Sequence, residues 1–208
     1  MTALDVRHGA PPGARAGDVV AEVEAERAAV SRLLHDDVAQ ALLAARYAAD
    51  LAGAPDVADA VRAAIREVTD AMWRLRPRTG EGDLVQALGD LAARHGDKVL
   101  ALRVEGLPRL ALAPATVAYR VVQAAVAAGD ATTVEVRAEV RSGVLTVSVS
   151  DDGTSYDAAV HAPDSELARW LGRACSLGGT ARVGASLTGG TTLWLEIPNA
   201  LPEGDDRP

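Results

Sequence analysis

The residues best suited to chemistry lie in one short stretch that contains His35, Asp36 and Gln40. A carboxylate beside an imidazole can hold one ring nitrogen of the histidine and leave the other free to attack an electrophile. Residues four apart share one side of a helix, so Asp36 and Gln40 are expected to lie together, with the Gln40 amide able to place a water molecule. A single helical histidine is more often an ordinary residue at the rim of a packed face. The three residues therefore indicate a function only if the rest of the chain supports it.

The elements that would position this stretch are two amphipathic helices. The spacing of apolar residues predicts a first helix over about 18–52, with one buried face and His35 at its rim. Turn residues at 53–56 end it, and a second helix follows that stops before Pro77. Two such helices form an antiparallel hairpin. Because one hairpin cannot bury both apolar faces, two copies are expected to pair as a four-helix bundle. The apolar positions are Val23, Val30, Leu34, Val38 and Leu42 in the first helix and Val57, Val61, Ile65, Val68, Met72 and Leu75 in the second.

The composition limits the classes of protein and partner. The 208 residues are 49% hydrophobic and 24% charged, which is typical of a globular protein with one or two domains. The net charge of -8 argues against a nucleic-acid partner bound through its phosphates. The single cysteine, Cys175, excludes an internal disulfide, and no apolar run approaches the roughly 18–20 residues that span a bilayer. We therefore expect a cytoplasmic protein with no membrane or nucleic-acid partner.

Turn residues and changes of pattern divide the chain into regions. Residues 1–18 are rich in Gly and Pro and are expected to be a flexible arm, and residues 19–77 form the hairpin. Residues 78–82 break the helical pattern, residues 83–198 have a mixed α and β pattern, and residues 199–208 are an acidic tail expected to be disordered. The elements predicted in the mixed region are helices over 83–96, from Pro114 onward and over 165–177, and strands over 98–104, 132–140, 144–150, 180–186 and 191–197.

Two short segments of the mixed region have the chemistry of a nucleotide site. Residues 150–153 place two acids directly after a strand, where the carboxylate of Asp151 can accept a hydrogen bond from a ligand. Residues 188–192 place two adjacent glycines before the last strand, where small residues let backbone amides approach phosphates. Each segment alone is also a common turn at the end of a strand, so their order along the chain gives them their weight.

From about residue 20 to residue 198 the chain resembles the sensor histidine kinases that partner NarL-type response regulators. Residues 31–40 are similar to the phosphoacceptor helix of that family, residues 120–125 to the helix that supplies its metal ligand, and residues 74–77 to the end of its second helix. The resemblance implies an α+β protein in which the four-helix bundle is followed by a GHKL (Bergerat-type) α/β sandwich. It also implies that His35 carries a phosphoryl group, that Asp36 acts as its base and that Gln40 aids dephosphorylation of the partner. The implied ATP contacts are Asp151, Gly153, Gly189, Gly190 and Thr191.

The chain departs from this family at the metal end of the ATP site. Ala124 and Ala128 stand where the family has a glutamate and an asparagine, and neither alanine can bind a metal ion. Ser155 replaces a glycine of the acidic segment, residues 164–167 replace the glycines of the lid, and Leu33 replaces a glutamate before the histidine. Loss of the metal ligand alone should remove most capacity for phosphoryl transfer from ATP. We therefore predict no metal site and a degenerate ATP site, with ATP and Mg²⁺ as cofactors only if the site still works.

The sequence leads to one main hypothesis and three alternatives. The main hypothesis is a homodimeric, histidine-kinase-like signalling protein that exchanges a phosphoryl group with a response-regulator receiver domain, or dephosphorylates it, through His35. Such a protein would resemble stand-alone histidine phosphotransferases that keep a decayed kinase body. The first alternative is an active kinase that autophosphorylates His35. The second is a non-enzymatic regulator that docks onto a kinase or receiver through the helix face near Arg46 and Tyr47, and in the third the motifs are relics.

Overall fold

The computed structural model forms two compact units, Ala21–Pro77 and a second unit made of Met1–Val20 and Arg78–Pro208. It describes residues 4–5, 16–75, 83–95, 98–104, 106–128, 130–153, 162, 164–186 and 189–202. The predicted boundary segment 78–82 and the last six residues of the acidic tail lie outside the described residues. The units are described one at a time below.

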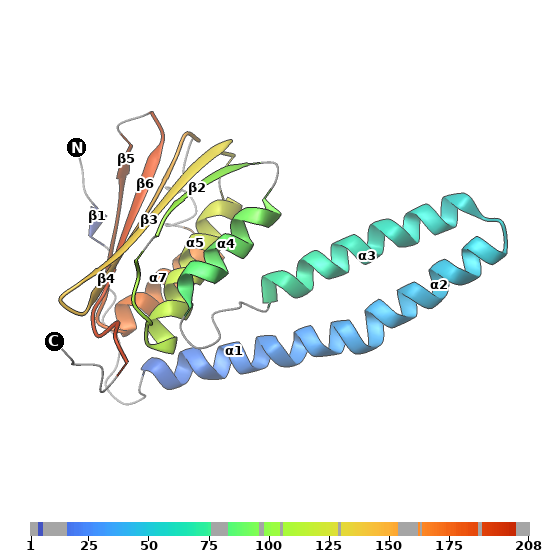
Figure 1. The fold of residues 1–208 in the computed structure, drawn as a ribbon, viewed down its shortest axis with the longest axis horizontal. Helices are drawn as coiled ribbons and strands as arrows, with labels where there is room; N and C mark the ends of the chain where they lie inside the picture. Colours follow the sequence, from blue (N-terminus) through green and yellow to red (C-terminus); the bar gives the residue numbers. More distant parts are fainter. Residues whose placement is uncertain are drawn as a thin grey trace. The chain divides into compact units, whose positions relative to one another are not determined.

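The first unit is the predicted helical hairpin. Its first arm is one continuous helix in three parts, α1 (Ala16–Leu33), a π-helical turn η1 (Leu34–Ala39) and α2 (Gln40–Leu51). Its second arm is α3 (Pro55–Leu75), which runs alongside α2 and also contacts η1 (Figure 1). Gly53, with a φ of 65°, makes the left-handed turn between the arms. The hydroxyl of Ser31 donates to the carbonyl of Met72 at 3.4 Å and joins the two arms at the other end.

The apolar face predicted for the first arm is not covered within the single hairpin. Val30 and Val38 of that face are 42% and 36% exposed, and the buried side chains of the arm are those of Val20, Ser31 and Ala49. The prediction assumed a constant 3.6-residue period, and the π turn adds one residue to the repeat in the middle of the helix. After the turn the less exposed position therefore falls on Ala39 rather than on Val38. Burial of Val30 and Val38 in a pair of hairpins stays a prediction.

The second unit is a two-layer α+β sandwich. Its sheet has the strand order β1-β5-β6-β4-β3-β2, in which only β2 and β3 pair in parallel among the described strands. Three helices lie on one side of the sheet (Figure 1). The strands are β1 (Leu4–Asp5), β2 (Val99–Arg103), β3 (Thr133–Arg141), β4 (Val144–Asp151), β5 (Thr180–Ala185) and β6 (Thr191–Ile197). The helices are α4 (Leu84–Arg94), α5 (Leu112–Ala128) and α7 (Glu166–Ser176).

Local chemistry explains where these elements begin and turn. The side chain of Asp83 accepts the backbone N–H of Gln86 at 2.9 Å, and Ser165 accepts that of Ala168 at 3.0 Å, so both helices have the cap that the sequence predicts. Ser142 and Gly143 both have positive φ, as a two-residue type I′ hairpin requires between β3 and β4. The strands alternate as predicted, with one side of each buried against the helices and the other side polar.

The ends of the second unit are more ordered than the sequence indicates. β1 lies in the segment expected to be a flexible arm, and its Leu4 pairs with Val183 of β5. In the segment expected to be a disordered tail, Ala200 is fully buried, donates its N–H to the carbonyl of Gly143 and accepts the N–H of Ala111. The backbone thus remains part of the sandwich through Ala200. No helix of the described residues is long and apolar enough to cross a membrane.

Candidate functional site

His35 and Asp36 form a contact pair in the π turn of the hairpin. The Nδ1 atom of His35 lies 3.0 Å from Oδ1 of Asp36, and the two side chains are 66% and 67% exposed. Because a carboxylate can only accept, the neutral imidazole carries its proton on Nδ1 and donates it to Asp36. Nε2 is then left with its lone pair, and no described residue bonds to it. This is the arrangement of a nucleophilic imidazole held in one tautomer by an acid.

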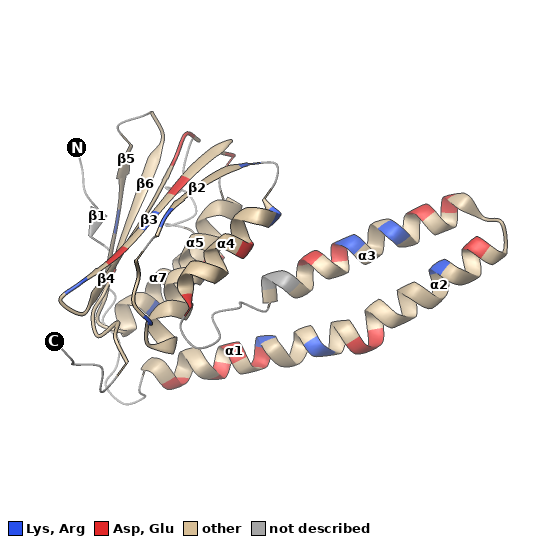
Figure 2. Ribbon diagram, in the orientation of Figure 1, with Lys and Arg blue, Asp and Glu red and all other residues tan. Residues whose placement is uncertain are grey.

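Gln40 is the first residue of α2 and is exposed. It follows directly after the π turn, one turn along the helix from Asp36. Acidic and basic residues are interspersed along both arms of the hairpin (Figure 2). The described part of the hairpin therefore does not present one uniform sign of charge to a partner. The three residues predicted as one set thus lie together on one exposed segment.

Asp151 is the buried acid of the second unit. Its side chain is 4% exposed, and its Oδ1 atom accepts the backbone N–H groups of Thr191 at 3.0 Å and Gly153 at 3.2 Å. Its other oxygen, Oδ2, is buried and has no hydrogen-bond partner among the described residues. A buried carboxylate oxygen without a partner costs free energy unless a ligand or water donates to it. The structure therefore holds one oriented acceptor at this position.

The glycines beside Asp151 are required by close backbone approach. A Cβ atom at Gly190 would overlap the carbonyl oxygen of Asp151, and one at Gly153 would lie 2.6 Å from a carboxylate oxygen of Asp130. Gly189 has a φ of 92°, which side chains rarely adopt. The acidic and glycine segments, which are forty residues apart in sequence, are thus packed directly against each other, as the sequence hypothesis requires.

Asp152, the neighbouring acid, has a structural role that sequence reasoning missed. Its Oδ1 accepts the backbone N–H groups of Thr132 and Thr133 at 2.9 Å each, and its Oδ2 accepts the Thr132 hydroxyl at 2.8 Å. These bonds, first that from the Thr133 backbone and then that from the Thr132 hydroxyl, lower the pKa of Asp152 from 3.8 to about 2. The side chain is thereby committed to the start of β3 and is not available to a ligand.

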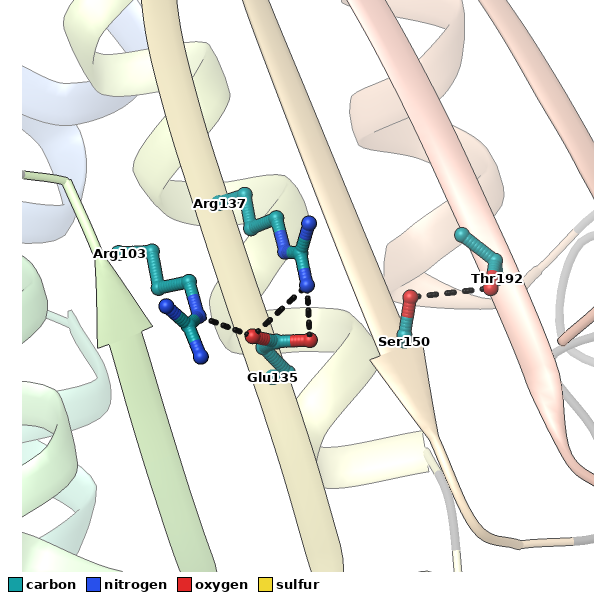
Figure 3. A network of polar contacts seen from close by, with 5 residues as sticks. All are labelled: Arg103, Glu135, Arg137, Ser150 and Thr192. Carbon is teal, nitrogen blue, oxygen red and sulfur yellow. Dashed lines mark hydrogen bonds and ion pairs between the residues drawn. The ribbon is translucent and has the colours of Figure 1, made fainter. Parts of the chain in front are cut away.

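The side of the sheet away from the helices carries a polar network (Figure 3). Glu135 of β3 accepts from Arg103 of β2 and from Arg137 at 2.9 Å, and both arginines lower the pKa of its carboxyl, Arg137 first. On the neighbouring strands the hydroxyls of Ser150 and Thr192 lie 3.0 Å apart, next in sequence to Asp151 and Thr191. The Ser150–Thr192 bond ties β4 to β6 where the acidic and glycine segments meet.

The described residues of α5 offer no metal ligands at the positions where the resemblance implies them. Ala124 is buried and Ala128 is exposed on α5, and no group of three acids, histidines or cysteines among the described residues could hold a metal ion. The retained residues of this helix serve packing. The guanidinium of Arg120 is buried, donates to Gln123 Oε1 at 2.8 Å and lies 5.8 Å from the ring of Trp170 on α7. The residues that the structure describes here therefore do not fit Mg²⁺, whereas the free carboxylate oxygen of Asp151 fits the amino group of an adenine.

The predicted site residues thus form two sets. His35, Asp36 and Gln40 lie in the hairpin unit, and Asp151, Gly153, Gly189, Gly190 and Thr191 lie in the sandwich unit. The sequence contains a signal for the role of Asp152, because two hydroxyl residues, Thr132 and Thr133, lie where β3 begins. That signal alone does not show which of the two adjacent acids reaches them, because this depends on the register between β3 and β4. The π turn has no sequence signal that we recognise.

Comparison with known proteins gives similar solved structures only. No protein-family model matches the sequence, and no curated protein matches it. The ATP-binding domain of PrrB from Mycobacterium tuberculosis is similar at 25% identity and a TM-score of 0.44, covering 56% of this chain and 92% of that one. The histidine kinase domain of a blue-light-activated histidine kinase from Erythrobacter litoralis is similar at 19% identity and a TM-score of 0.47, covering 86% and 95%.

Full-length ShkA in complex with AMPPNP is a third similar structure, at 20% identity and a TM-score of 0.48. That similarity covers 86% of this chain but 47% of ShkA, so the chain spans about half of ShkA's length. One of these three solved structures is a histidine kinase domain, one is an ATP-binding domain and one is a complex with AMPPNP, and all three TM-scores are below 0.5. The proposal below therefore rests on the residues and contacts of this chain.

Proposed function

We propose that this protein is a histidine-kinase-like component of two-component signalling. In this proposal a homodimer exchanges a phosphoryl group with the receiver domain of a response regulator through His35, or dephosphorylates that domain, and its ATP site is impaired. The observation that carries the proposal is the His35–Asp36 pair, 3.0 Å apart and exposed, on a helical hairpin followed by an α+β sandwich. The order of these elements and motifs is that of the family which the sequence resembles.

The geometry supports a balanced transfer step. The lone pair of His35 Nε2 attacks the phosphorus of a phospho-aspartate, an N–P bond forms, the acyl P–O bond breaks, and the aspartate leaves as a carboxylate. The imidazole ring gains positive charge in this step. Asp36 accepts the proton on Nδ1 at 3.0 Å and stabilises that charge. An exposed pair is suitable for this reaction because the phosphorylated residue must be brought in by another protein.

Dephosphorylation would use Gln40 rather than His35 as the main group. The amide of Gln40 can accept one hydrogen bond from a water molecule and donate another to the phosphoryl group, which places the water for attack on phosphorus. Attack by water breaks the same P–O bond and yields the aspartate and inorganic phosphate. Gln40 is exposed beside the His35–Asp36 pair, so a docked receiver could either transfer its phosphoryl group to His35 or lose it to water.

Unpaired apolar side chains on the hairpin support the homodimer. Leu33, Leu43 and Leu51 on the first arm and Val57 on the second are exposed in the single chain. Exposed leucines on a helix are costly in water and are normally covered by another apolar surface. A second copy of the hairpin supplies such a surface, as in a four-helix bundle.

The second unit supports binding of an adenine group but not metal-dependent transfer from ATP. The Oδ2 atom of Asp151 is the buried acceptor that an adenine amino group needs. Ala124 and Ala128 provide no oxygen for Mg²⁺. When bound, ATP with Mg²⁺ would supply the phosphoryl group in an active kinase, and this chain would lack the means to neutralise its charge.

The test is a phosphoryl-transfer assay with purified receiver domains phosphorylated chemically. Wild-type protein should acquire acid-labile, base-stable phosphate on His35 or accelerate loss of the receiver's phosphate. His35→Ala should abolish labelling, and Gln40→Ala should reduce the dephosphorylation rate by about tenfold or more. A wild type that does neither with any receiver of the same organism would refute the proposal.

A second arm of the assay uses γ-labelled ATP and Mg²⁺ without a receiver. The impaired site predicts no label on the wild type. Label that is absent from His35→Ala would instead establish the active-kinase alternative. If both arms are negative, while variants of the face near Arg46 and Tyr47 lose the cellular effect, the regulator alternative would replace the proposal.

A further inference from the structure

The π turn at His35 lies in an otherwise regular helix. The residues on either side, Leu33 and Gln40, both have α-helical backbone angles, with φ and ψ of -56° and -45° and of -67° and -40°. The turn itself contains no glycine or proline that would explain a break. Single π turns are rare, and they occur frequently at functional sites. The first arm therefore carries one extra residue at the segment that holds the candidate nucleophile.

The burial pattern shows the effect of that residue. Before the turn the less exposed positions follow helical spacing through Ser31 and Leu34, and after it they resume at Ala39, Leu42, Arg46 and Ala49. The steps are of three or four residues except for the step from Leu34 to Ala39, which is five. A five-residue step matches the i to i+5 repeat of a π turn. On either side of the turn the first arm thus still meets α3, through the Ser31–Met72 hydrogen bond before it and through the packing of α2 after it.

The same repeat changes which side chains share a face. In an α-helix, residues five apart are about 140° apart around the axis, because each residue turns by about 100°. In a π turn, with about 4.4 residues per turn, the same two residues are only roughly 50° apart. His35 and Gln40 are five apart and are separated by the π turn. The turn therefore brings Gln40 to the side of the helix that carries His35.

We propose that the π turn is a positioning device, with Val38 and Ala39 as its positioning residues, that places His35 and Gln40 on one exposed face. The reaction they would serve rests on the proposed function, whereas their placement on one face does not. The sequence has an apolar residue for the packed position in both registers of the helix, with and without the π turn. Ala39 is the less exposed residue in the π register, and Val38, which is 36% exposed here, would occupy that position in an unbroken α-helix.

The placement is tested by a metal-binding probe that needs no receiver. In the full chain, Gln40→His creates two histidines on one face if the π turn is present. Such a pair should bind Ni²⁺ at least about tenfold more tightly than the matched control Gln40→His/His35→Ala. Ala41→His is a second control, since that position points away from His35 in either register, and it should not bind more tightly than a single histidine. Equal Ni²⁺ affinity in Gln40→His and its His35→Ala control would overturn the inference.

The positioning role is tested by shifting the register. Val38→Leu/Ala39→Glu favours the unbroken α-helix, because leucine is suited to the packed position and glutamate is not. This variant should lose the enhanced Ni²⁺ binding in the Gln40→His background. In the native background it should lose dephosphorylation of the receiver by about tenfold, while transfer to His35 stays within about threefold, since His35 and Asp36 remain neighbours. Retained dephosphorylation after loss of the Ni²⁺ site would overturn the role.

Two further variants distinguish an effect of the helix register from general damage to the helix by substitution. Val38→Glu removes the apolar residue that the α register needs and should keep both the Ni²⁺ site and dephosphorylation. Deletion of Val38 removes the extra residue, and His35 and Gln40 then lie four apart on one face of an α-helix. That variant should also keep both readouts, although its helix has no π turn. If wild type shows no dephosphorylation but the Ni²⁺ pattern holds, the proposed function fails and the placement stands.

Discussion

The buried carboxylate of Asp151 accepts the backbone N–H of Thr191 at 3.0 Å. This bond joins the acidic segment to the glycine segment, the two segments that the sequence suggested as parts of a nucleotide site. Together with the bond from the N–H of Gly153, it commits Oδ1 to the backbone. The other oxygen, Oδ2, is buried and has no hydrogen-bond partner in the described part of the chain. A rigidly held acceptor of this kind recognises a single donor, which distinguishes an amino-bearing base from one that carries a carbonyl at the same position.

Asp151→Asn should abolish adenine recognition without unfolding the sandwich. The amide oxygen of Asn can still accept from Thr191 and Gly153, while its NH₂ group replaces the acceptor Oδ2 with a donor. Binding of adenosine diphosphate, measured by calorimetry, should weaken by about tenfold or more, because the free acceptor is worth about 1–3 kcal/mol. Removal of Mg²⁺ with a chelator should change the wild-type affinity little, since no described residues form a metal site. Asp152→Asn is the matched control and should bind normally; equal weakening in both variants would show that only the fold is affected.

Asp152 should make stability depend on pH in the acid range. Its pKa in the folded chain is about 2, against 3.8 for an ordinary aspartate. A lowered pKa means that the ionised form stabilises the fold above about pH 4 and that this contribution is lost as pH falls from about 4 toward 2. In urea unfolding, Asp152→Asn should therefore be less stable than wild type at pH 6, and the two curves should converge near pH 2. A constant difference across that range would assign the effect to packing rather than to ionisation.

Gly190→Ala should destabilise the sandwich unit strongly. The added Cβ would overlap the carbonyl oxygen of Asp151 and approach Cα of Asp152 to 2.9 Å, and backbone atoms cannot rotate away as side chains can. Overpacking of this kind costs about 1–3 kcal/mol or more. Gly89→Ala is the control, because its Cβ would meet nothing within 4 Å in the middle of α4 and should stabilise by about 0.5–1 kcal/mol. Thermal unfolding followed by tryptophan fluorescence distinguishes the two, and similar melting temperatures would contradict the close approach.

The elements of both units could be predicted because their signals are local. Caps at Asp83 and Ser165, the turn at Ser142–Gly143 and the alternation of β3 and β4 each arise from neighbouring residues. The contact of Asp151 with Thr191 depends on register between strands, so the sequence indicates the two residues but not the bond between them. The role of Asp152 could not be predicted in this way, because which acid faces the helices and which reaches β3 follows from the pleat.

The errors arise where an element departs from its ideal period or where distant chain segments meet. Val38 fits the apolar repeat of an α-helix, whereas in the single hairpin the π turn places Ala39 rather than Val38 at the less exposed position. Ala200 lies after the last strand among polar and proline residues, and its burial depends on backbone bonds to Gly143 and Ala111. Neither effect leaves a pattern in the residues next to it.

Leu33→Asp should convert the proposed homodimer to a monomer. Leu33 is 59% exposed in the single chain, directly before the π turn, where pairing of two hairpins would cover it. A buried leucine contributes about 1.5–3 kcal/mol, and a two-fold interface loses that contribution twice, so the dissociation constant should rise by at least about a hundredfold. Burial of the new carboxylate would add to the loss. Sedimentation velocity of wild type and variant at the same concentration measures the change.

Leu112→Asp is the control for this prediction, since Leu112 is 56% exposed on the sandwich unit and its replacement should leave the dimer intact. A wild type that is already monomeric at tens of micromolar would instead mean that another partner covers the exposed leucines of the hairpin.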